Sequence, residues 1–198
     1  MVRKITKWEI MGCYLNDYSR RHYLRELADL LKKSHQSIKP YVEELTKESI
    51  LIRYDRKNLV EYGLNLKDRR TYDYLIISEK ERLIKRLEED TYLRTLFEKL
   101  SPYFRDNTFI IFGSASERLQ KGSDIDLCLI AEDEIVKREI KSILKITPIN
   151  VDLQEFSSQE FLQMLKSKEN NVGNEIVKNN VILYGLEQFY KLVNNVKQ

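Results

Sequence analysis

The sequence predicts an α+β fold built from two modules, a helical front module that ends in a β-hairpin and a back module in which helices alternate with strands. Three observations lead to this prediction. Apolar residues recur every three or four positions through the first 45 residues, which is the period of an amphipathic helix. After residue 91, short apolar runs alternate with such helical stretches. Residues 1–70 hold 16 Lys and Arg against 10 Asp and Glu, a net charge of +6, whereas residues 71–198 carry −3, which gives +3 for the whole chain.

Three short helices are expected in the front module. Residues 8–15 and 22–33 show helical periodicity, and the apolar positions of a third helix are Ile38, Tyr41, Val42 and Leu45. Either Ser34 or Ser37 caps this third helix. Pro40 distinguishes the two, because it falls in the first turn if Ser37 is the cap and kinks the helix if Ser34 is the cap.

Two strands over 50–54 and 59–62 follow the helices, joined by a polar turn. This order, together with the stretch LADLLKKSHQSIKPYVEEL, resembles the winged helix-turn-helix of many prokaryotic transcription regulators over about residues 8–66. The resemblance implies double-stranded DNA as a partner. The residues it places on DNA are His35, Gln36, Ser37 and Lys39 in the second helix of the pair, and Arg53, Arg56 and Lys57 on the wing. The alternative is that this domain, residues 1–66, docks a protein or dimerises.

Residues 67–90 are expected to form a helical connector. Ser78 and Glu81 have the spacing of a capping box, which predicts two helices that meet near Ser78. The apolar stripe of the connector also suits a homodimer, since a helix that packs on neither module must bury that stripe elsewhere. A helix over 91–103 then leads into the back domain, residues 91–198.

The back module is organised around two strands. Phe109–Phe112 is a short apolar run typical of a buried strand, and Gly113-Ser114 ends it. In Asp124–Ile130, polar and apolar residues alternate at the start and an apolar run follows, which predicts a second strand. Side chains alternate faces along a strand, so Asp124 and Asp126 point the same way. Two neighbouring carboxylates at the start of a buried strand repel each other, which favours a cation between them. Oxygen ligands of this kind suit Mg²⁺ or Mn²⁺.

Gly113-Ser114, a spacer of nine residues and Asp124-x-Asp126 resemble the signature of the minimal nucleotidyltransferases of the polymerase-β-type superfamily. In that family a third carboxylate lies on a later strand, and Asp152 in the alternating run 149–153 matches it. The final stretch NVGNEIVKNNVILYGLEQFYKLV also resembles the end of archaeal and bacterial members. The resemblance implies an α/β domain with a mixed sheet. Many members continue with Ala-Arg-Gly after Gly-Ser, and this chain departs from them there.

This resemblance implies a metal-dependent enzyme that moves a nucleoside monophosphate from a triphosphate such as ATP to a hydroxyl of a protein, nucleic acid or small molecule. Asp124, Asp126 and Asp152 would hold two Mg²⁺ or Mn²⁺ ions and carry the catalysis. The residues it assigns to the nucleotide are Gly113, Ser114, Arg118, Lys121 and Ser123.

A competing hypothesis is a DNA-binding regulator or antitoxin. Minimal nucleotidyltransferases that resemble this chain often act beside a small helical toxin, so the back domain would sense nucleotide or bind a partner toxin. No apolar run approaches the roughly 20 residues of a membrane span, and the N-terminus lacks the apolar core of a signal peptide. We therefore expect a cytoplasmic protein with no membrane partner.

Overall fold

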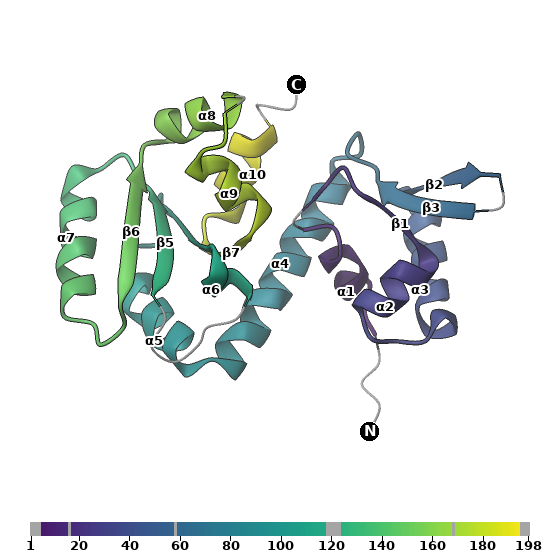
Figure 1. Ribbon diagram of the computed structural model, residues 1–198, viewed down its shortest axis with the longest axis horizontal. Coiled ribbons are helices and arrows are strands. Elements are labelled where there is room, and N and C mark those ends of the chain that lie inside the picture. The colour runs from purple at the N-terminus through teal and green to yellow at the C-terminus, as the bar shows by residue number, and fades with distance from the viewer. Residues whose placement is uncertain (1–4, 16, 58, 118–123, 168, 195–198) are drawn as a thin grey trace. The chain divides into compact units, whose positions relative to one another are not determined.

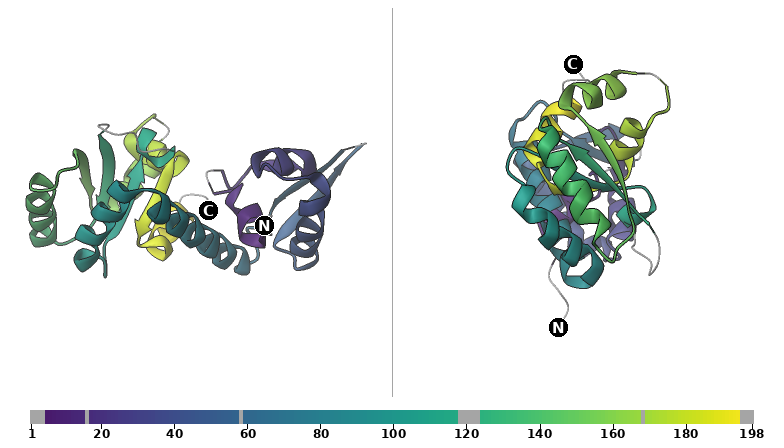
Figure 2. Two further views of the ribbon diagram at one scale, coloured as in Figure 1. Left: turned by 90° about the horizontal axis from the view of Figure 1, so that it is seen from below. Right: turned by 90° about the vertical axis from the view of Figure 1, so that its left-hand side faces the viewer.

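The computed structural model divides the chain into two compact units, residues 1–82 and 83–198 (Figures 1 and 2). It is an α+β structure with two sheets, as the sequence predicts. The described residues are 5–15, 17–57, 59–117, 124–167 and 169–194.

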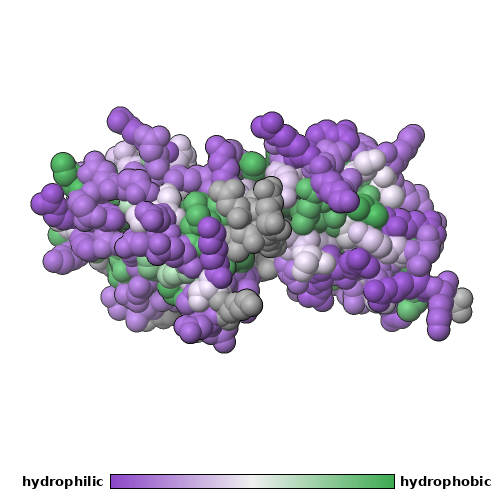
Figure 3. Space-filling model, turned by 90° about the horizontal axis from the view of Figure 1, so that it is seen from above, coloured by the Kyte–Doolittle hydropathy of each residue, from purple (hydrophilic) through white to green (hydrophobic). Residues whose placement is uncertain are grey.

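The face drawn in Figure 3 is covered mostly by hydrophilic side chains. None of the described helices combines the length and the apolarity that crossing a membrane requires.

The first unit packs helices α1 (Lys7–Gly12), α2 (Leu24–Leu30) and α3 (His35–Lys47) against an antiparallel sheet. Its described strands lie in the order β1 (Arg21–Tyr23), β3 (Leu59–Leu64) and β2 (Leu51–Arg56). The apolar faces of the helices meet in a core whose fully buried members include Ile10, Met11, Leu27, Ile38, Val42, Leu45 and Ile50.

The structure decides which residue caps α3 and corrects the predicted start of α2. Ser34 caps α3, because its hydroxyl accepts a hydrogen bond from the main-chain nitrogen of Ser37 at 3.2 Å, and Pro40 therefore lies inside the helix. The helix predicted to begin at residue 22 begins instead at Leu24. The preceding residues Arg21–Tyr23 pair with β3, so a contact distant in sequence overrides the local helical period.

Helix α4 (Arg70–Glu89) is one continuous helix of 20 residues, so the prediction of two helices that meet near Ser78 is wrong. Ser78 is buried within it, and its hydroxyl donates to the main-chain carbonyl of Trp8 at 2.6 Å. Ser78 and Glu81 lie one turn apart in any helix, so their spacing alone does not require a helix end. The hydroxyl serves a contact between distant segments instead.

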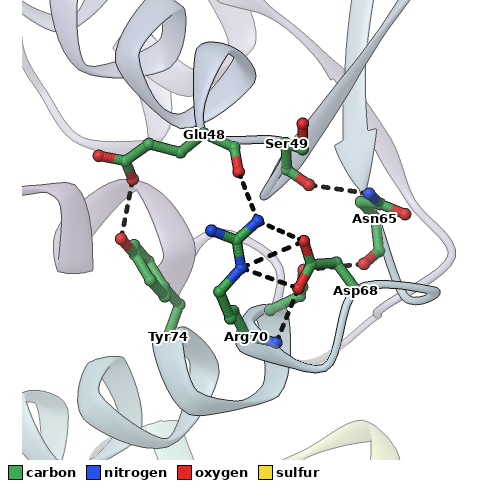
Figure 4. A network of polar contacts seen from close by, with 7 residues as sticks. Glu48, Ser49, Asn65, Asp68, Arg70 and Tyr74 are labelled. Atoms are coloured by element: carbon green, nitrogen blue, oxygen red, sulfur yellow. Dashed lines mark hydrogen bonds and ion pairs between the residues drawn. The ribbon is translucent and has the colours of Figure 1, made fainter.

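A polar network fixes the start of α4 to the end of α3 (Figure 4). The Arg70 guanidinium donates to the main-chain carbonyl of Glu48 at 3.1 Å and to the Asp68 carboxylate at 2.6 Å. The Tyr74 hydroxyl donates to the Glu48 carboxylate at 2.8 Å. The Arg70–Asp68 ion pair is partly exposed, so it contributes little stability by itself.

His22 is buried in the first unit, with 1% of its surface exposed, and its ring forms a T-shaped pair with Tyr14 at a centroid distance of 5.0 Å. Burial lowers the pKa of His22 below its ordinary value, and Arg20 lowers it further, although Cys13 and Glu26 oppose the shift. In acid the unfolded chain therefore binds a proton that the folded chain excludes. We expect the free energy of unfolding of the first unit to fall as the pH drops below about 6.5.

Chemical denaturation between pH 5.5 and 8 checks this prediction. The single tryptophan of the chain, Trp8, lies in the first unit and reports its unfolding. His22→Gln should flatten the pH dependence. His35→Gln is the matched control, because His35 is the other histidine of the chain and is exposed. Equal pH dependence in His22→Gln and the wild type would contradict the assignment.

The second unit is built on a mixed sheet. Its described strands lie in the order β6 (Val151–Phe156), β5 (Ile125–Ile130), β4 (Thr108–Phe112) and β7 (Asn180–Tyr184). Strand β4 is antiparallel to β5 and β7, whereas β5 and β6 are parallel. This is the mixed sheet that the family resemblance implies.

Helices cover both faces of this sheet (Figures 1 and 2). One apolar cluster joins alternate residues of β4, β5 and β7 to α5 (Thr91–Leu100) and α7 (Glu134–Lys145). The other face packs against α8 (Ser158–Lys166), α9 (Val172–Lys178) and α10 (Leu186–Asn194). A 3₁₀ turn (Ser101–Tyr103) continues α5, and the short helix α6 (Ser114–Glu117) follows β4.

Candidate functional site

The register of the sheet brings two of the predicted acids together. Asp126 of β5 lies opposite Asp152 of β6 in the parallel pair. Residues paired across a sheet project from the same face, so the two carboxylates share one face. Asp124 directly precedes β5 and accepts a hydrogen bond from the amide of Asn150, directly before β6, at 2.5 Å. The three acids therefore lie at the end of the sheet where β5 and β6 begin.

The electrostatic environment of Asp126 is unfavourable for a carboxylate. Burial raises its pKa, and the negative charges of Asp152, Glu175 and Asp124 raise it further. Glu175 belongs to α9 and was not singled out in the sequence. Asp126 is half-buried, whereas the other three acids are exposed. A cation bound among these groups would relieve the repulsion.

Amide side chains orient two of the acids. Asn150 donates to Asp124, and the Gln154 amide donates to the Asp152 carboxylate at 3.3 Å. These amides add hydrogen bonds without adding charge. Sequence reasoning missed both residues, although their positions two before and two after Asp152 indicate the same face of a strand.

Gly113 brings the main chain close to the acid pair. Its φ is 64°, in the left-handed region that favours glycine. A Cβ atom there would collide with Oδ2 of Asp126. The Ser116 hydroxyl donates to the Gly113 carbonyl at 2.7 Å and closes the turn, while Ser114 is exposed. We call residues 113–116 the Gly-Ser turn, and it adjoins the carboxylates as the sequence motif implies.

Three of the predicted nucleotide contacts, Arg118, Lys121 and Ser123, lie outside the described residues. Within the part of the chain that the structure describes, no three His, Cys, Asp or Glu side chains form a ready-made set of metal ligands.

The predicted DNA contacts lie at the start of α3 and on the β2–β3 hairpin. His35, Gln36 and Ser37 are exposed in the first turn of α3, and Lys39 pairs with Glu43 at 3.6 Å. His35 and Lys39 also line a pocket of ≈ 550 Å³ together with residues of α2 and β3.

The basic residues of the hairpin have acidic neighbours. Arg53 pairs with Asp55 at 2.8 Å, and Arg56 pairs with Glu61 at 3.4 Å. Lys57 follows β2, is exposed and has a φ of 49°. Both arginines remain more than half exposed, so these pairs are weak enough for a phosphate to compete with the carboxylates.

Comparison with known proteins supports the interpretation of the second unit. Residues 93–179 match the family model of the nucleotidyltransferase domain, and this range holds the Gly-Ser turn and all three acids. A solved structure of TrmBL2, an archaeal chromatin protein, is similar at 14% sequence identity and a TM-score of 0.27, covering 85% of this chain and 68% of that chain. No curated protein matches the chain.

Proposed function

We propose that the second unit catalyses metal-dependent transfer of a nucleoside monophosphate from a nucleoside triphosphate, such as ATP, to a hydroxyl of a protein, nucleic acid or small molecule. The observation that carries this proposal is the pairing of Asp126 with Asp152 beside Gly113. The match of residues 93–179 to the nucleotidyltransferase domain supports it.

In this proposal, Asp124, Asp126 and Asp152 hold two Mg²⁺ or Mn²⁺ ions. Carboxylate oxygens are the donors that these hard cations prefer. The raised pKa of Asp126 agrees with the assignment, because its causes include the crowding of carboxylates that a cation neutralises. When bound, the metal neutralises charge on the phosphate oxygens.

The chain itself binds and orients the reactants. The main-chain N–H groups of Gly113 and Ser114 and the exposed Ser114 hydroxyl donate to the triphosphate. The acceptor oxygen attacks the α-phosphorus, the bond from that phosphorus to the bridging oxygen breaks, and pyrophosphate leaves. Asp152 is exposed, and its carboxylate takes the proton of the attacking hydroxyl. Arg118, Lys121 and Ser123 are further candidate contacts to the phosphates.

Labelled transfer tests this function. The full chain is incubated with each α-labelled ribonucleoside triphosphate, Mg²⁺ or Mn²⁺ and cell extract. We expect a labelled product that disappears in Asp124→Asn and Asp152→Asn. The exposed Asp106 of the same unit provides the control, and Asp106→Asn should retain the product. Absence of label with every nucleotide, together with absence of triphosphate binding by calorimetry, would overturn the proposal.

We propose a second function for the first unit, the binding of double-stranded DNA as a winged helix. The specific observation is that His35 and Lys39 of α3 line the same pocket as Leu59 and Val60 of β3. Helix α3 and the β2–β3 hairpin therefore border one surface. That surface carries the exposed His35 and Lys39, side chains of the kind that contact bases and phosphates. Its lining also includes the acidic Glu26 and Asp29.

Wing and helix substitutions are expected to affect DNA binding differently. Arg56→Ala should weaken binding to all duplexes alike and reduce the slope of log affinity against log salt by about 1, whereas Gln36→Ala should reduce discrimination between sites. A gel-shift titration against the protein's own upstream region at two salt concentrations measures both effects. Arg138→Ala, an exposed arginine of α7, is the control.

The same assays separate the remaining hypotheses. Absence of DNA binding at low salt would contradict the second function and leave a protein-docking or dimerisation role for the first unit. DNA binding together with triphosphate binding but no transfer would favour a regulator or antitoxin whose second unit senses nucleotide or binds a helical toxin.

A further inference from the structure

The C-terminal half of α4 contacts the Gly-Ser turn directly. Nη1 of Arg86 donates to the main-chain carbonyl of Ser116 at 2.7 Å, and Nη2 donates to the carbonyl of Ala115 at 3.1 Å. The arginine is half-buried, and all three residues belong to the second unit. One side chain therefore holds two successive carbonyls of α6.

The geometry of this contact suits an arginine better than a lysine. A guanidinium is planar and presents its N–H donors in a fixed fork, so it reaches both carbonyls at once. Its positive charge also strengthens the two hydrogen bonds to these main-chain carbonyls. A lysine would keep the charge but lose the fork.

The segment that Arg86 holds touches the acid pair. Ala115 is 1% exposed and belongs to the apolar core, and Ser116 is hydrogen-bonded to Gly113. Gly113 in turn lies against Oδ2 of Asp126. Direct contacts thus lead from Arg86 through the Gly-Ser turn to Asp126. A displacement of α6 would change the distance between the main chain of the turn and that carboxylate.

We propose that Arg86 is a positioning residue for the nucleotide, one that holds the Gly-Ser turn against Asp126 so that the main-chain donors of the turn face the triphosphate. This inference rests on the proposed nucleotidyl transfer. Arg86 acts through the carbonyls of Ala115 and Ser116.

Arg86→Lys in the full chain is the test. We expect KM for the triphosphate to rise about 10- to 100-fold, because small misplacements of a binding group cost this much, while KM for the acceptor stays unchanged. Amide hydrogen exchange of residues 113–117 should accelerate in the chain without nucleotide. If the lysine variant does not fold, Arg86→Gln replaces it in the same measurements, because the glutamine amide keeps uncharged N–H donors.

Arg94 provides a matched control. This arginine of α5 donates to the carbonyls of Leu87 and Glu88 at 2.9 and 3.0 Å, the same kind of contact at the end of α4. Arg94→Lys should leave both KM for the triphosphate and exchange in the Gly-Ser turn as in the wild type. An equal rise of KM in both arginine variants would overturn the specific role of Arg86.

The two proposals fail in distinguishable ways. If the wild type transfers nucleotide and Arg86→Lys keeps its KM and its exchange pattern, the role of Arg86 is overturned and the proposed function stands. If the wild type neither binds nor transfers nucleotide, the proposed function fails and the nucleotide-positioning role fails with it. Hydrogen exchange then still shows whether Arg86 holds the turn.

Discussion

Asp126→Asn is expected to lower kcat/KM for nucleotidyl transfer by about 10³-fold while the protein stays folded. Asparagine matches the shape of aspartate but carries no charge, so the site loses its central negative charge and one of the two oxygen donors of that side chain. The stability of the second unit should not fall. Because burial, Asp152, Glu175 and Asp124 all raise the pKa of Asp126, its ionised form is disfavoured in the folded chain, and removing that charge relieves the repulsion.

Transfer assays and thermal unfolding at neutral pH check the two halves of this prediction. Asp106→Asn, at an exposed acid of the same unit, should change neither quantity. Retained activity in Asp126→Asn would exclude it as a catalytic residue. A large loss of stability would show instead that the carboxylate makes a structural contact that the asparagine amide does not replace.

Gly113→Ala should reduce triphosphate turnover about 100-fold and lower the free energy of unfolding by about 1–2 kcal/mol. The stability loss follows from the backbone, because φ is 64° and an alanine is strained there. The activity loss follows from the site, since the added Cβ would collide with Oδ2 of Asp126 and push either the turn or the carboxylate away.

Gly185→Ala separates these two causes. Gly185 also has a positive φ, 84°, and a Cβ there would approach the Cα of Thr108 to 2.8 Å. We therefore expect a stability loss at least as large as that of Gly113→Ala, because a backbone atom cannot move aside. Activity and KM for the triphosphate should remain near wild type at a temperature where both variants are folded. Equal activity loss in the two variants would show that the effect of Gly113→Ala is global.

Local pattern in the sequence determined the elements around the site. An apolar run ending in Gly-Ser predicted β4, and the alternation after residue 124 predicted β5 with Asp126 on a face opposite to Ile125 and Leu127. These predictions depend only on the period of a strand, which neighbouring residues define. Local pattern misread Ser78, and it misread His22 and Tyr23, because the deciding contacts come from Trp8 and from β3.

The sequence by itself thus determined the α+β class, most of the helices and strands, and the candidate acids, the third of them through a family resemblance. Only the tertiary structure decided that Asp152 lies in register with Asp126, that Glu175 adds its charge, and that Arg86 holds the Gly-Ser turn. The physical reason is separation along the chain. Periodicity constrains residues within a turn or a strand, whereas strand register and helix packing join residues tens of positions apart through contacts that no local pattern encodes.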